Sequence, residues 1–424
     1  MDAYIVIAVL ILMIAAFVAN KWPFGLITMT CCIILGVVGV LDVPTAFSGF
    51  CNPFVVMLAG AFVVTNALAR TSFIGRLQKN LMKMQDGKSG IKLMLIFVIA
   101  IIVLATFMPG PALLAIIIMM ARNLNDEGEV NAARVILPAA ALTTLWNGRI
   151  PFGIGAGQFA ILDGFLESAG EQYSIGMFDP MLAGLVPGIL LAIYTISCYK
   201  LLPHKKLDTI AVETNEDRNK EQPKMSKRNE IITYVTFVVM LLLMIFNQFT
   251  GNLLYIGPAV CAVFLVFTKV ITVEDVKKGI TVDLIFMLAG IFTLTSALSS
   301  TGAGEIIGHA IISLFGGNMT QFSLVAIFSG IAVVVTNFMS NNATMYSLIP
   351  VAVTTALAAG LNPVPAVLAI DVAVKCACAL PCSSGEAAMC YGASGYTIKD
   401  TWKFTIPANI LFYVGTLAGV YLFF

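Results

Sequence analysis

Apolar residues follow one another in long runs along this chain, and short polar interruptions separate the runs. A helix needs about 20 apolar residues to cross the ~30 Å hydrocarbon core of a bilayer. Many runs reach or approach this length, so the pattern predicts an all-α polytopic membrane protein. Helices are expected over 3–19, 24–41, 52–69, 130–149 and 180–200 in the first half, and over 230–247, 254–270, 281–299, 364–380 and 403–423 in the second.

Each half also contains two shorter apolar arms around a polar or Pro/Gly-rich break. The arms cover 92–107 with 110–121 in the first half, and 322–337 with 343–358 in the second. We interpret each pair as a hairpin, about 92–121 and about 322–358. The segments "RTSFIGRLQKNLMKM" (70–84) and "GEIIGHAIISLFGG" (304–317) precede them, and are predicted to be surface helices.

The two halves resemble each other in sequence. "FVVMLAGAFVVTNALART" (54–71) recurs as "LIFMLAGIFTLTSALSST" (284–301), at a separation of 230 residues. "FMPGPA" (107–112) recurs as "FMSNNA" (338–343) at a separation of 231 residues. A shared register over this length indicates an internal duplication.

Composition supports a membrane protein. Apolar residues make up 59% of the chain and charged residues 11%, whereas charged residues are about 25% of soluble domains. The net charge of +1 gives no indication of a nucleic-acid partner. The nine cysteines lie mostly in apolar segments, where a thiol usually packs as a small hydrophobe, so no disulfide framework is predicted.

Lysine and arginine predict the topology, because they favour cytoplasmic loops. If both hairpins enter the bilayer and return, each half has five crossings and the second half is inverted. Every Lys and Arg except Arg149 and Lys375 then lies on one side, in or beside the loops 20–23, 70–91, 122–130, 200–229, 270–280 and 383–402.

Two inverted repeats of five transmembrane helices, each with a re-entrant hairpin, follow from this topology. The repeats cover 1–202 and 230–424, and a charged cytoplasmic linker covers 203–229. Both termini are expected outside the cytoplasmic membrane. Inverted repeats with helices broken near the midplane are typical of secondary transporters.

The tip of the second hairpin carries the motif "SNNAT" (340–344), in which Ser340, Asn341, Asn342 and Thr344 are polar. Irregular backbone at membrane depth is tolerated where it is buried in protein or lines a wet cavity. Side-chain oxygens suit a cation such as sodium, and amides with helix N-termini suit an anion. The alternative is a capping motif that only satisfies the interrupted backbone.

A second polar interruption, "ALPCSSGEAAMCYGASGY" (379–396), contains Ser383, Ser384, Gly385 and Glu386. Its counterpart in the first half is "WNGRIPFGIGAGQF" (146–159). We predict that both are helix–loop–helix breaks facing the hairpin tips. The alternative is an ordinary loop at a helix end.

Few charges lie inside the apolar zone, and such residues are candidates for function. Asp371 and Lys375 are four residues apart, so they can pair on one helix face, either as a neutral structural pair or as coupling groups. Arg149 has no acidic neighbour in sequence. It offsets the charge of an anionic substrate, or its side chain snorkels to the interface.

These motifs resemble the divalent anion:sodium symporters, which carry dicarboxylates, citrate and sulfate. "SNNATMYSLIP" is similar to their Ser-Asn-Thr hairpin motif, "LPCSSGEAA" to their Pro-containing break, and "SGYTIKDTWKFTIPANIL" to the stretch before their last helix. The resemblance implies a homodimer in which a transport part moves against a scaffold, as an elevator.

The resemblance also implies site residues. Sodium would be bound by Ser340, Asn341, Ser383, Ser384 and Gly385. The small anion would be bound by Asn341, Asn342, Thr344, Gly110 and Ser384, with Arg149 balancing its charge.

Two departures from the family pattern bear on coupling. The first hairpin reads Pro109-Gly110-Pro111 in place of Ser-Asn-Thr, so it lacks the usual amide and hydroxyl ligands. The second break reads Gly385-Glu386-Ala387 where Pro-Pro-Asn is usual. Coupling to sodium or to protons is therefore expected, with Glu386, Asp371 and Lys375 as candidate coupling residues.

Two other functions stay open on the same fold. A cation/proton exchanger or metalloid efflux permease would use Asp371 and Glu386 as its core. The second open function is that of a membrane subunit of a multi-component carrier. The segment "SIGMFDPMLAGLVPGILLAIY" (174–194) weakly resembles membrane subunits of the tripartite periplasmic carriers. No nucleotide loop, zinc motif or hydrolase triad is found, so neither an enzyme nor a cofactor is expected.

Overall fold

The computed structural model describes residues 2–19, 21–72, 90–121, 130–152, 157–170, 173–205, 225–245, 253–280, 282–314, 319–381 and 383–424, together with residues 124 and 155. Every regular element in these ranges is helical, as the apolar pattern predicts. The first half contains α1 (Asp2–Ala19), α2 (Phe24–Val37), α3 (Val43–Ala46), η1 (Ser48–Cys51), α4 (Pro53–Ala69), α6 (Gly90–Ala105), α7 (Gly110–Ala121), α8 (Ala132–Trp146), α9 (Gln158–Ser168), α10 (Asp179–Cys198) and η3 (Tyr199–Leu201). The second contains α12 (Lys227–Ile245), α14 (Leu253–Phe267), α15 (Val273–Gly279), α16 (Val282–Ser300), α17 (Ala303–Leu314), α18 (Gln321–Val335), α19 (Asn341–Ala358), α20 (Val364–Ala373), α21 (Gly385–Ser394) and α22 (Ile398–Phe423).

The helix ends follow local capping chemistry. Asn52 accepts a hydrogen bond from the Phe54 amide and precedes Pro53, which suits the first position of α4 because it has no N–H to satisfy. Thr320 and Ser323 form a reciprocal capping box at the start of α18. Caps of this kind place most helix ends within a few residues of the predicted bounds.

Two parts of the predicted helix map are corrected. α20 ends at Ala373 rather than at residue 380, because residues 374–381 and 383–384 form an irregular break around Pro381. α21 is a helix inside 383–402, which was expected to be a loop, and Ser384 caps its first turn. α9 likewise continues the chain as a helix after the first break.

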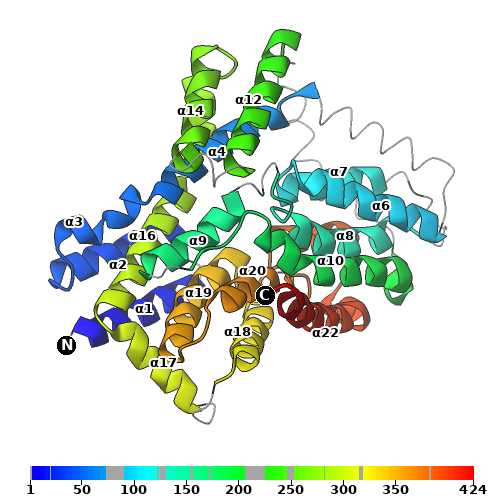
Figure 1. The fold of residues 1–424 in the computed structure, drawn as a ribbon. Coiled ribbons are helices and arrows are strands. Elements are labelled where there is room, and N and C mark those ends of the chain that lie inside the picture. The colour runs from blue at the N-terminus through cyan, green and yellow to red at the C-terminus, as the bar shows by residue number, and fades with distance from the viewer. Residues whose placement is uncertain are drawn as a thin grey trace.

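The helices of the two halves occur in corresponding order (Figure 1). The hairpin α6–α7 corresponds to α18–α19, the interrupted pair α8–α9 to α20–α21, and α10 to α22. Packing between the halves is reciprocal, since α2 packs on α16 while α4 packs on α14, and α10 packs on α22. Helices of the first half therefore pack on helices of the second.

Small residues bring α2 and α16 together. A Cβ atom on Gly290 would lie 2.6 Å from Thr28 Cβ, so the absence of a side chain there permits the close approach of the two helices. The Gly25 amide also donates to Asp283 Oδ1 at 2.9 Å. These contacts hold α2 of the first half against α16 of the second.

The end of α4 is joined to the short helix α15 by an ion pair. Arg70 Nη1 lies 2.7 Å from Asp275 Oδ1. Burial acts to raise the pKa of Asp275, but hydrogen bonds from the Thr272 backbone and hydroxyl, together with Arg70, lower it to about 2. The two halves are therefore tied electrostatically at this surface as well.

Three described helices are long and apolar enough to cross a membrane: Asp2–Ala19, Asp179–Leu201 and Ile398–Phe423. α16 and α17 form a fourth candidate span that bends by 78°. Seven further apolar helices among the described residues have only 10–17 residues, so several of the ten crossings predicted from sequence are shorter than a full membrane span. Outer helices expose large apolar side chains, such as Ile11, Val238 and Ile410.

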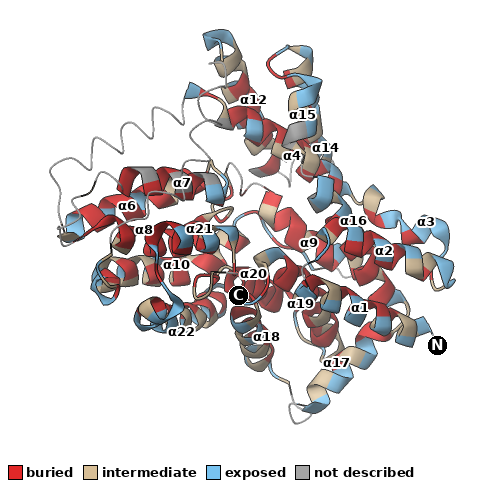
Figure 2. Ribbon diagram, turned by 180° about the vertical axis from the view of Figure 1, so that it is seen from behind, coloured by how far each residue is buried: buried red, intermediate tan, exposed pale blue. Residues whose placement is uncertain are grey.

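Buried residues concentrate in α8, α19 and α20, and α19 and α20 lie near the centre of the molecule (Figure 2). The predicted surface helix at 304–317 corresponds to α17, which packs along α19. The other predicted surface segment, 70–84, and the linker 203–229 lie largely outside the described residues.

Candidate functional site

The tips of both hairpins lie against the interrupted helices. α7 packs on α8 and α21, and α19 packs on α20 and contacts α9. The predicted helix–loop–helix breaks are present, because α8 ends at Trp146 before α9 begins at Gln158, and α20 ends at Ala373 before α21 begins at Gly385. Irregular backbone from all four segments therefore meets at the centre of the molecule.

The tip of the second hairpin is anchored to the second break. The Thr336 hydroxyl lies 2.7 Å from the Val374 carbonyl oxygen and 2.9 Å from Asn341 Oδ1. The Ala379 amide donates to Asn337 Oδ1 at 3.1 Å, and Ser340 caps α19. These bonds satisfy backbone groups that the interruption leaves without helical partners.

The tip of the first hairpin is built differently. Asn147, which follows α8, donates through Nδ2 to the Met108 carbonyl at 2.7 Å. Pro109 and Pro111 flank Gly110 at the start of α7 and contribute neither an N–H nor a polar side chain. The Glu386 side chain lies directly against Gly110, with its Cδ 2.9 Å from where a Cβ atom would be.

The second break presents its serines close to the hairpins. Ser384 Oγ accepts a hydrogen bond from the Ala387 amide at 3.0 Å and so caps α21. The Ser383 hydroxyl donates to the Leu380 carbonyl at 2.6 Å. Both serines thus hold the turn that leads from α20 to α21.

A cavity of about 260 Å³ lies between these segments. Most of the candidate residues named from the sequence line it, and Thr144 and Asn147 are additional lining residues that sequence reasoning missed. The lining residues are Thr144, Asn147, Ser340, Asn341, Asn342, Lys375, Ser383, Ser384, Gly385 and Glu386.

Two helix N-termini open into this cavity. The first-turn amides of a helix have no carbonyl partner within the helix. The Ser340 and Ser384 side chains cap only the amides of Ala343 and Ala387. The amides of Asn341 and Asn342 at α19, and of Gly385 at α21, remain as donors at the positive ends of two helix dipoles.

Lys375 adds a basic side chain to the lining of the cavity. It is the only basic residue among the described lining residues, and Glu386 is the only acidic one. The ion pairs between described residues join Arg70 to Asp275, Arg149 to Asp371 and Lys205 to Asp400, and Lys375 belongs to none of them. Its side chain interacts electrostatically with Asp371 and Glu386.

Arg149 and Asp371 form a fully buried ion pair, and neither residue lines the cavity. Their side chains are 1% and 0% exposed, and Arg149 Nη1 donates to Asp371 Oδ2. Gln158 Nε2 donates to Asp371 Oδ1 at 2.7 Å, and Arg149 Nη1 also donates to the Pro180 carbonyl at 3.0 Å. Asp371 therefore neutralises Arg149 within the protein, which does not fit the expectation that Arg149 faces a substrate.

The predicted pairing of Asp371 with Lys375 is corrected by this geometry. The four-residue spacing brings two side chains together only if the helix continues through both. α20 ends at Ala373, so Lys375 lies in the break and not on the same helix face as Asp371. The partner of Asp371 is instead 222 residues away in sequence.

Two other predicted residues lie beside the cavity rather than in its lining. Thr344 is fully buried, and its hydroxyl donates to the Ser340 carbonyl at 3.1 Å. Gly110 borders the site through its contact with Glu386. Thr344 thus supports the hairpin tip, and Gly110 provides space for the Glu386 carboxylate.

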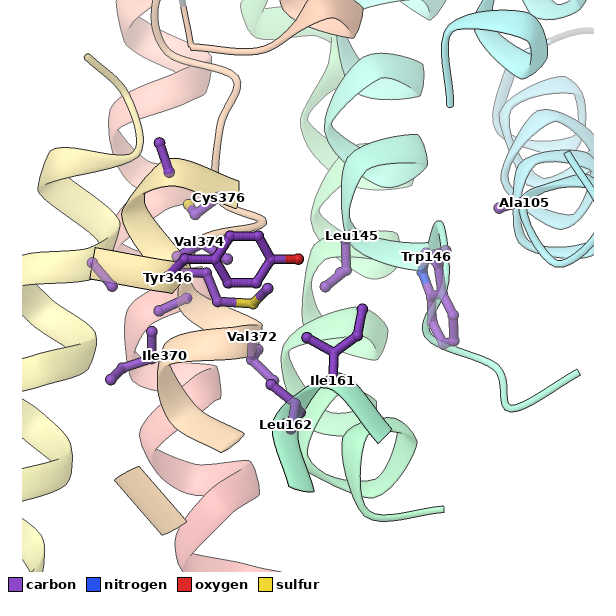
Figure 3. Packing of buried hydrophobic residues seen from close by; sticks show 14 of the residues in the cluster. Ala105, Leu145, Trp146, Ile161, Leu162, Tyr346, Ile370, Val372, Val374 and Cys376 are labelled. Atoms are coloured by element: carbon purple, nitrogen blue, oxygen red, sulfur yellow. The ribbon is translucent and has the colours of Figure 1, made fainter. Parts of the chain in front are cut away.

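Apolar side chains hold the two breaks at a fixed separation. The Tyr346 ring of α19 projects toward Leu145 of α8, between Val374 and Ile161 (Figure 3). Val372 and Leu162 belong to the same buried cluster (Figure 3). Residues from both halves therefore share one packed core.

The cysteines near the second break pack against the last helix. The thiols of Cys376 and Cys378 lie 3.0 and 3.8 Å from Asn409 Oδ1. Within the described residues, no group of three His, Cys, Asp or Glu side chains is arranged to hold a metal ion. Ser340, Asn341 and Ser383 line the cavity and carry side-chain oxygens.

Helical hairpins and interrupted helices around a small polar cavity define a membrane transporter. Residues 7–373 match the CitMHS citrate transporter family, and the chain belongs to this family. The similarity spans most of the chain, including both hairpins and α20.

Curated relatives are also transporters. A Haemophilus influenzae "uncharacterized transporter" is 22% identical over 97% of this chain and 91% of its own length. A Synechocystis relative is 26% identical, and human "solute carrier family 13 member 4" is 22% identical, each over 34% of this chain. The chain matches only 23% and 22% of the length of these two relatives.

Solved structures show the same fold. The Alcanivorax borkumensis YdaH transporter superposes with a TM-score of 0.64 at 13% identity, over 97% of this chain and 98% of that one. Neisseria gonorrhoeae MtrF, described as one of a class of antimetabolite efflux pumps, gives 0.62 at 13% identity, over 92% and 84%.

Proposed function

We propose that the protein is a secondary active transporter that moves a small anion across the cytoplasmic membrane. The observation that carries this proposal is the cavity in which the Lys375 ammonium and the N-termini of α19 and α21 converge. An anion there meets a basic side chain and several amide donors, which is the chemistry of a helix-terminus anion site.

The size of the cavity favours a small substrate. Pockets for drug-sized ligands have volumes of about 300–1,000 Å³, and this one is near 260 Å³. A dicarboxylate, citrate or sulfate is therefore the proposed class of substrate. The family description supports a carboxylate, and the amides of Asn341 and Asn342 would orient it.

Coupling and movement complete the proposal. Sodium would be bound by oxygens of Ser340, Asn341, Ser383, Ser384 and Gly385, or a proton would accompany the anion. Two inverted repeats, a homodimer and an elevator motion of the hairpins are the arrangement we infer. Reciprocal packing of the two halves and the correspondence of their hairpins support it.

The test is uptake into proteoliposomes that contain the purified protein. Labelled succinate, citrate and sulfate are supplied under an inward sodium gradient, and separately under an inward proton gradient. We expect gradient-driven uptake of at least one anion, and a loss of tenfold or more in Lys375→Gln and Asn341→Ala. A hydrogen bond to a charged group contributes about 1.5–3 kcal/mol, which corresponds to at least this loss.

Lys403→Gln is the matched control, because Lys403 is an exposed residue of α22 and does not line the cavity. Absence of uptake for all three anions under both gradients would contradict the proposal. Equal losses of uptake in Lys375→Gln and Lys403→Gln would contradict the proposal that the cavity binds the anion.

An exchanger with Asp371 as its core is less well supported by this geometry. Asp371 is fully buried and is neutralised by Arg149, whereas an exchanged cation must reach its carboxylate. Glu386 is the only acidic group among the described residues that line the cavity.

A further inference from the structure

The central cavity contains an acidic side chain as well as a basic one. Lys375 and Glu386 both line it, and they are the only charged residues among the described lining residues. The two side chains interact electrostatically, but the ion pairs between described residues include neither of them. The cavity therefore presents an acid and a base that do not close on each other.

Hydrogen-bond donors reach this cavity from α19 and α21. The first-turn amides of Asn342 and Gly385 are not capped by a side chain. The Asn341 side chain lines the cavity, and its Oδ1 already accepts a hydrogen bond from the Thr336 hydroxyl at 2.9 Å, so its Nδ2 supplies further donors. Donors at two helix N-termini suit the two carboxylates of one ligand.

Hydrogen-bond acceptors reach the cavity from the end of α8. Asn147 Nδ2 donates to the Met108 carbonyl at 2.7 Å, which leaves its Oδ1 as the group for a ligand. The Thr144 hydroxyl donates to the Ala140 carbonyl at 2.9 Å, so its oxygen can only accept from a ligand. α21 packs on α8, and the Glu386 carboxylate lines the same cavity. These acceptors suit a primary ammonium group, which has three N–H donors.

The first hairpin adds no other polar group beside Glu386. Pro109, Gly110 and Pro111 carry no side-chain oxygen. The Glu386 Cδ lies 2.9 Å from where a Cβ atom of Gly110 would be, so the carboxylate is held directly against this tip. A carboxylate in this place repels a simple dianion and attracts an anion that also carries a positive group. Such a combination of repulsion and attraction is how a site selects between similar ligands.

We propose that the substrate of the central cavity is an amino dicarboxylate, an anion with two carboxylates and one ammonium group. Its carboxylates bind at the N-termini of α19 and α21 beside Lys375, and its ammonium donates to Glu386, Asn147 and Thr144. Glu386 is thus a specificity-determining residue that selects for the ammonium group. This inference rests on the proposed anion transport and narrows its substrate class.

The test compares ligands that differ in a single group. Succinate, malate and aspartate share one carbon backbone, and the second carbon carries hydrogen, hydroxyl or ammonium. Equilibrium binding of each labelled ligand to the purified full-length protein is measured, with citrate and sulfate alongside. We expect aspartate to bind about tenfold more tightly than malate or succinate, because only the ammonium forms charged hydrogen bonds with the Glu386 carboxylate.

Glu386→Gln removes the charge and keeps the shape of the side chain. Aspartate should bind this variant about tenfold more weakly than the wild type, whereas malate and succinate should bind at least as tightly, because the repulsion is lost. Retained malate binding also shows that the variant is folded. Glu274→Gln makes the same change at an exposed residue of α15 that does not line the cavity, so it should behave as the wild type.

Thr144→Val removes one acceptor without a large change in shape. It should weaken aspartate binding about threefold and leave succinate binding unchanged, because a neutral hydrogen bond contributes less than a charged one. Equal weakening of aspartate and succinate in this variant would contradict a contact between Thr144 and the ammonium group.

The outcomes separate this inference from the function on which it rests. Binding of succinate, malate, citrate or sulfate without a preference for aspartate would overturn the inference and leave anion transport standing. A preference for aspartate that persists in Glu386→Gln would overturn the role of Glu386. No binding of any of these anions would overturn both the inference and the proposed function.

Discussion

Arg149 and Asp371 join the two interrupted helices through a buried ion pair. Arg149 follows α8 in the first half, and Asp371 is on α20 in the second. A buried ion pair contributes little net stability relative to an apolar pair, but the loss of one partner leaves an uncompensated charge. The pair therefore fixes how the two breaks face each other more than it adds to stability.

Removal of either partner should be strongly destabilising. Arg149→Met and Asp371→Leu should each lower the free energy of unfolding by about 3–5 kcal/mol, because the remaining charge stays buried. The double variant should recover much of this loss. Thermal unfolding of the four proteins in detergent measures the effect, and losses that simply add in the double variant would contradict a direct pairing.

Sequence reasoning identified the polar residues of the site more readily than their partners. Ser340, Asn341 and Ser384 interrupt apolar runs, so their position alone marks them. Asp371 was paired with the wrong residue because its partner comes from the other half of the chain. Thr144 and Asn147 were missed because a polar residue at the end of a helix has many ordinary explanations.

At the scale of helices, α17 connects the central bundle to the second hairpin. It bends by 78° from α16 and packs along α19. Cβ atoms on Gly304 and Gly308 would lie 2.5 Å from Thr354 Cγ2 and 2.6 Å from Ala358 Cβ. Two glycines four residues apart thus let α17 lie directly on the second arm of the hairpin.

A larger side chain in this contact should separate the helices. Gly308→Leu should lower the free energy of unfolding by about 1–3 kcal/mol, as overpacking of a close contact does. Ala310→Leu on the exposed face of the same helix is the matched control. Thermal unfolding distinguishes the two, and equal melting temperatures would show that the α17–α19 contact does not matter for stability.

The apolar pattern of the sequence predicted the extents of most helices. It predicted the positions at which helices are interrupted less accurately. Continuous apolar runs define α1, α10 and α22 from composition alone. Beyond the end of α20, the Thr336 hydroxyl donates to the Val374 carbonyl and Asn337 Oδ1 accepts from the Ala379 amide, and both residues belong to the second hairpin. The end of α20 could therefore not be predicted from the sequence of α20 alone.

For the whole molecule, the proposed inversion of the two halves has a direct consequence. The connection between α9 and α10 corresponds to the connection between α21 and α22, so the two must lie on opposite sides of the membrane. Tyr173 is 41% exposed in the first, and Lys399 is exposed at the start of α22 just after the second. Both are positions for a reporter thiol.

Labelling with a membrane-impermeant maleimide tests the inversion. In a background in which the exposed Cys51 is replaced by serine, Tyr173→Cys should react in intact cells. Lys399→Cys should react only after the membrane is opened, and the background protein without added thiols is the control. Reaction of both positions from one side would exclude inverted repeats.

The central claim is that the cavity between the hairpin tips and the breaks binds a small anion through Lys375. The most direct measurement is equilibrium binding of labelled citrate, succinate and sulfate to the purified wild type, Lys375→Gln and Lys403→Gln. Saturable binding of at least one anion that weakens tenfold or more in Lys375→Gln and is unchanged in Lys403→Gln is the predicted result. Wild-type affinity in Lys375→Gln would contradict the claim.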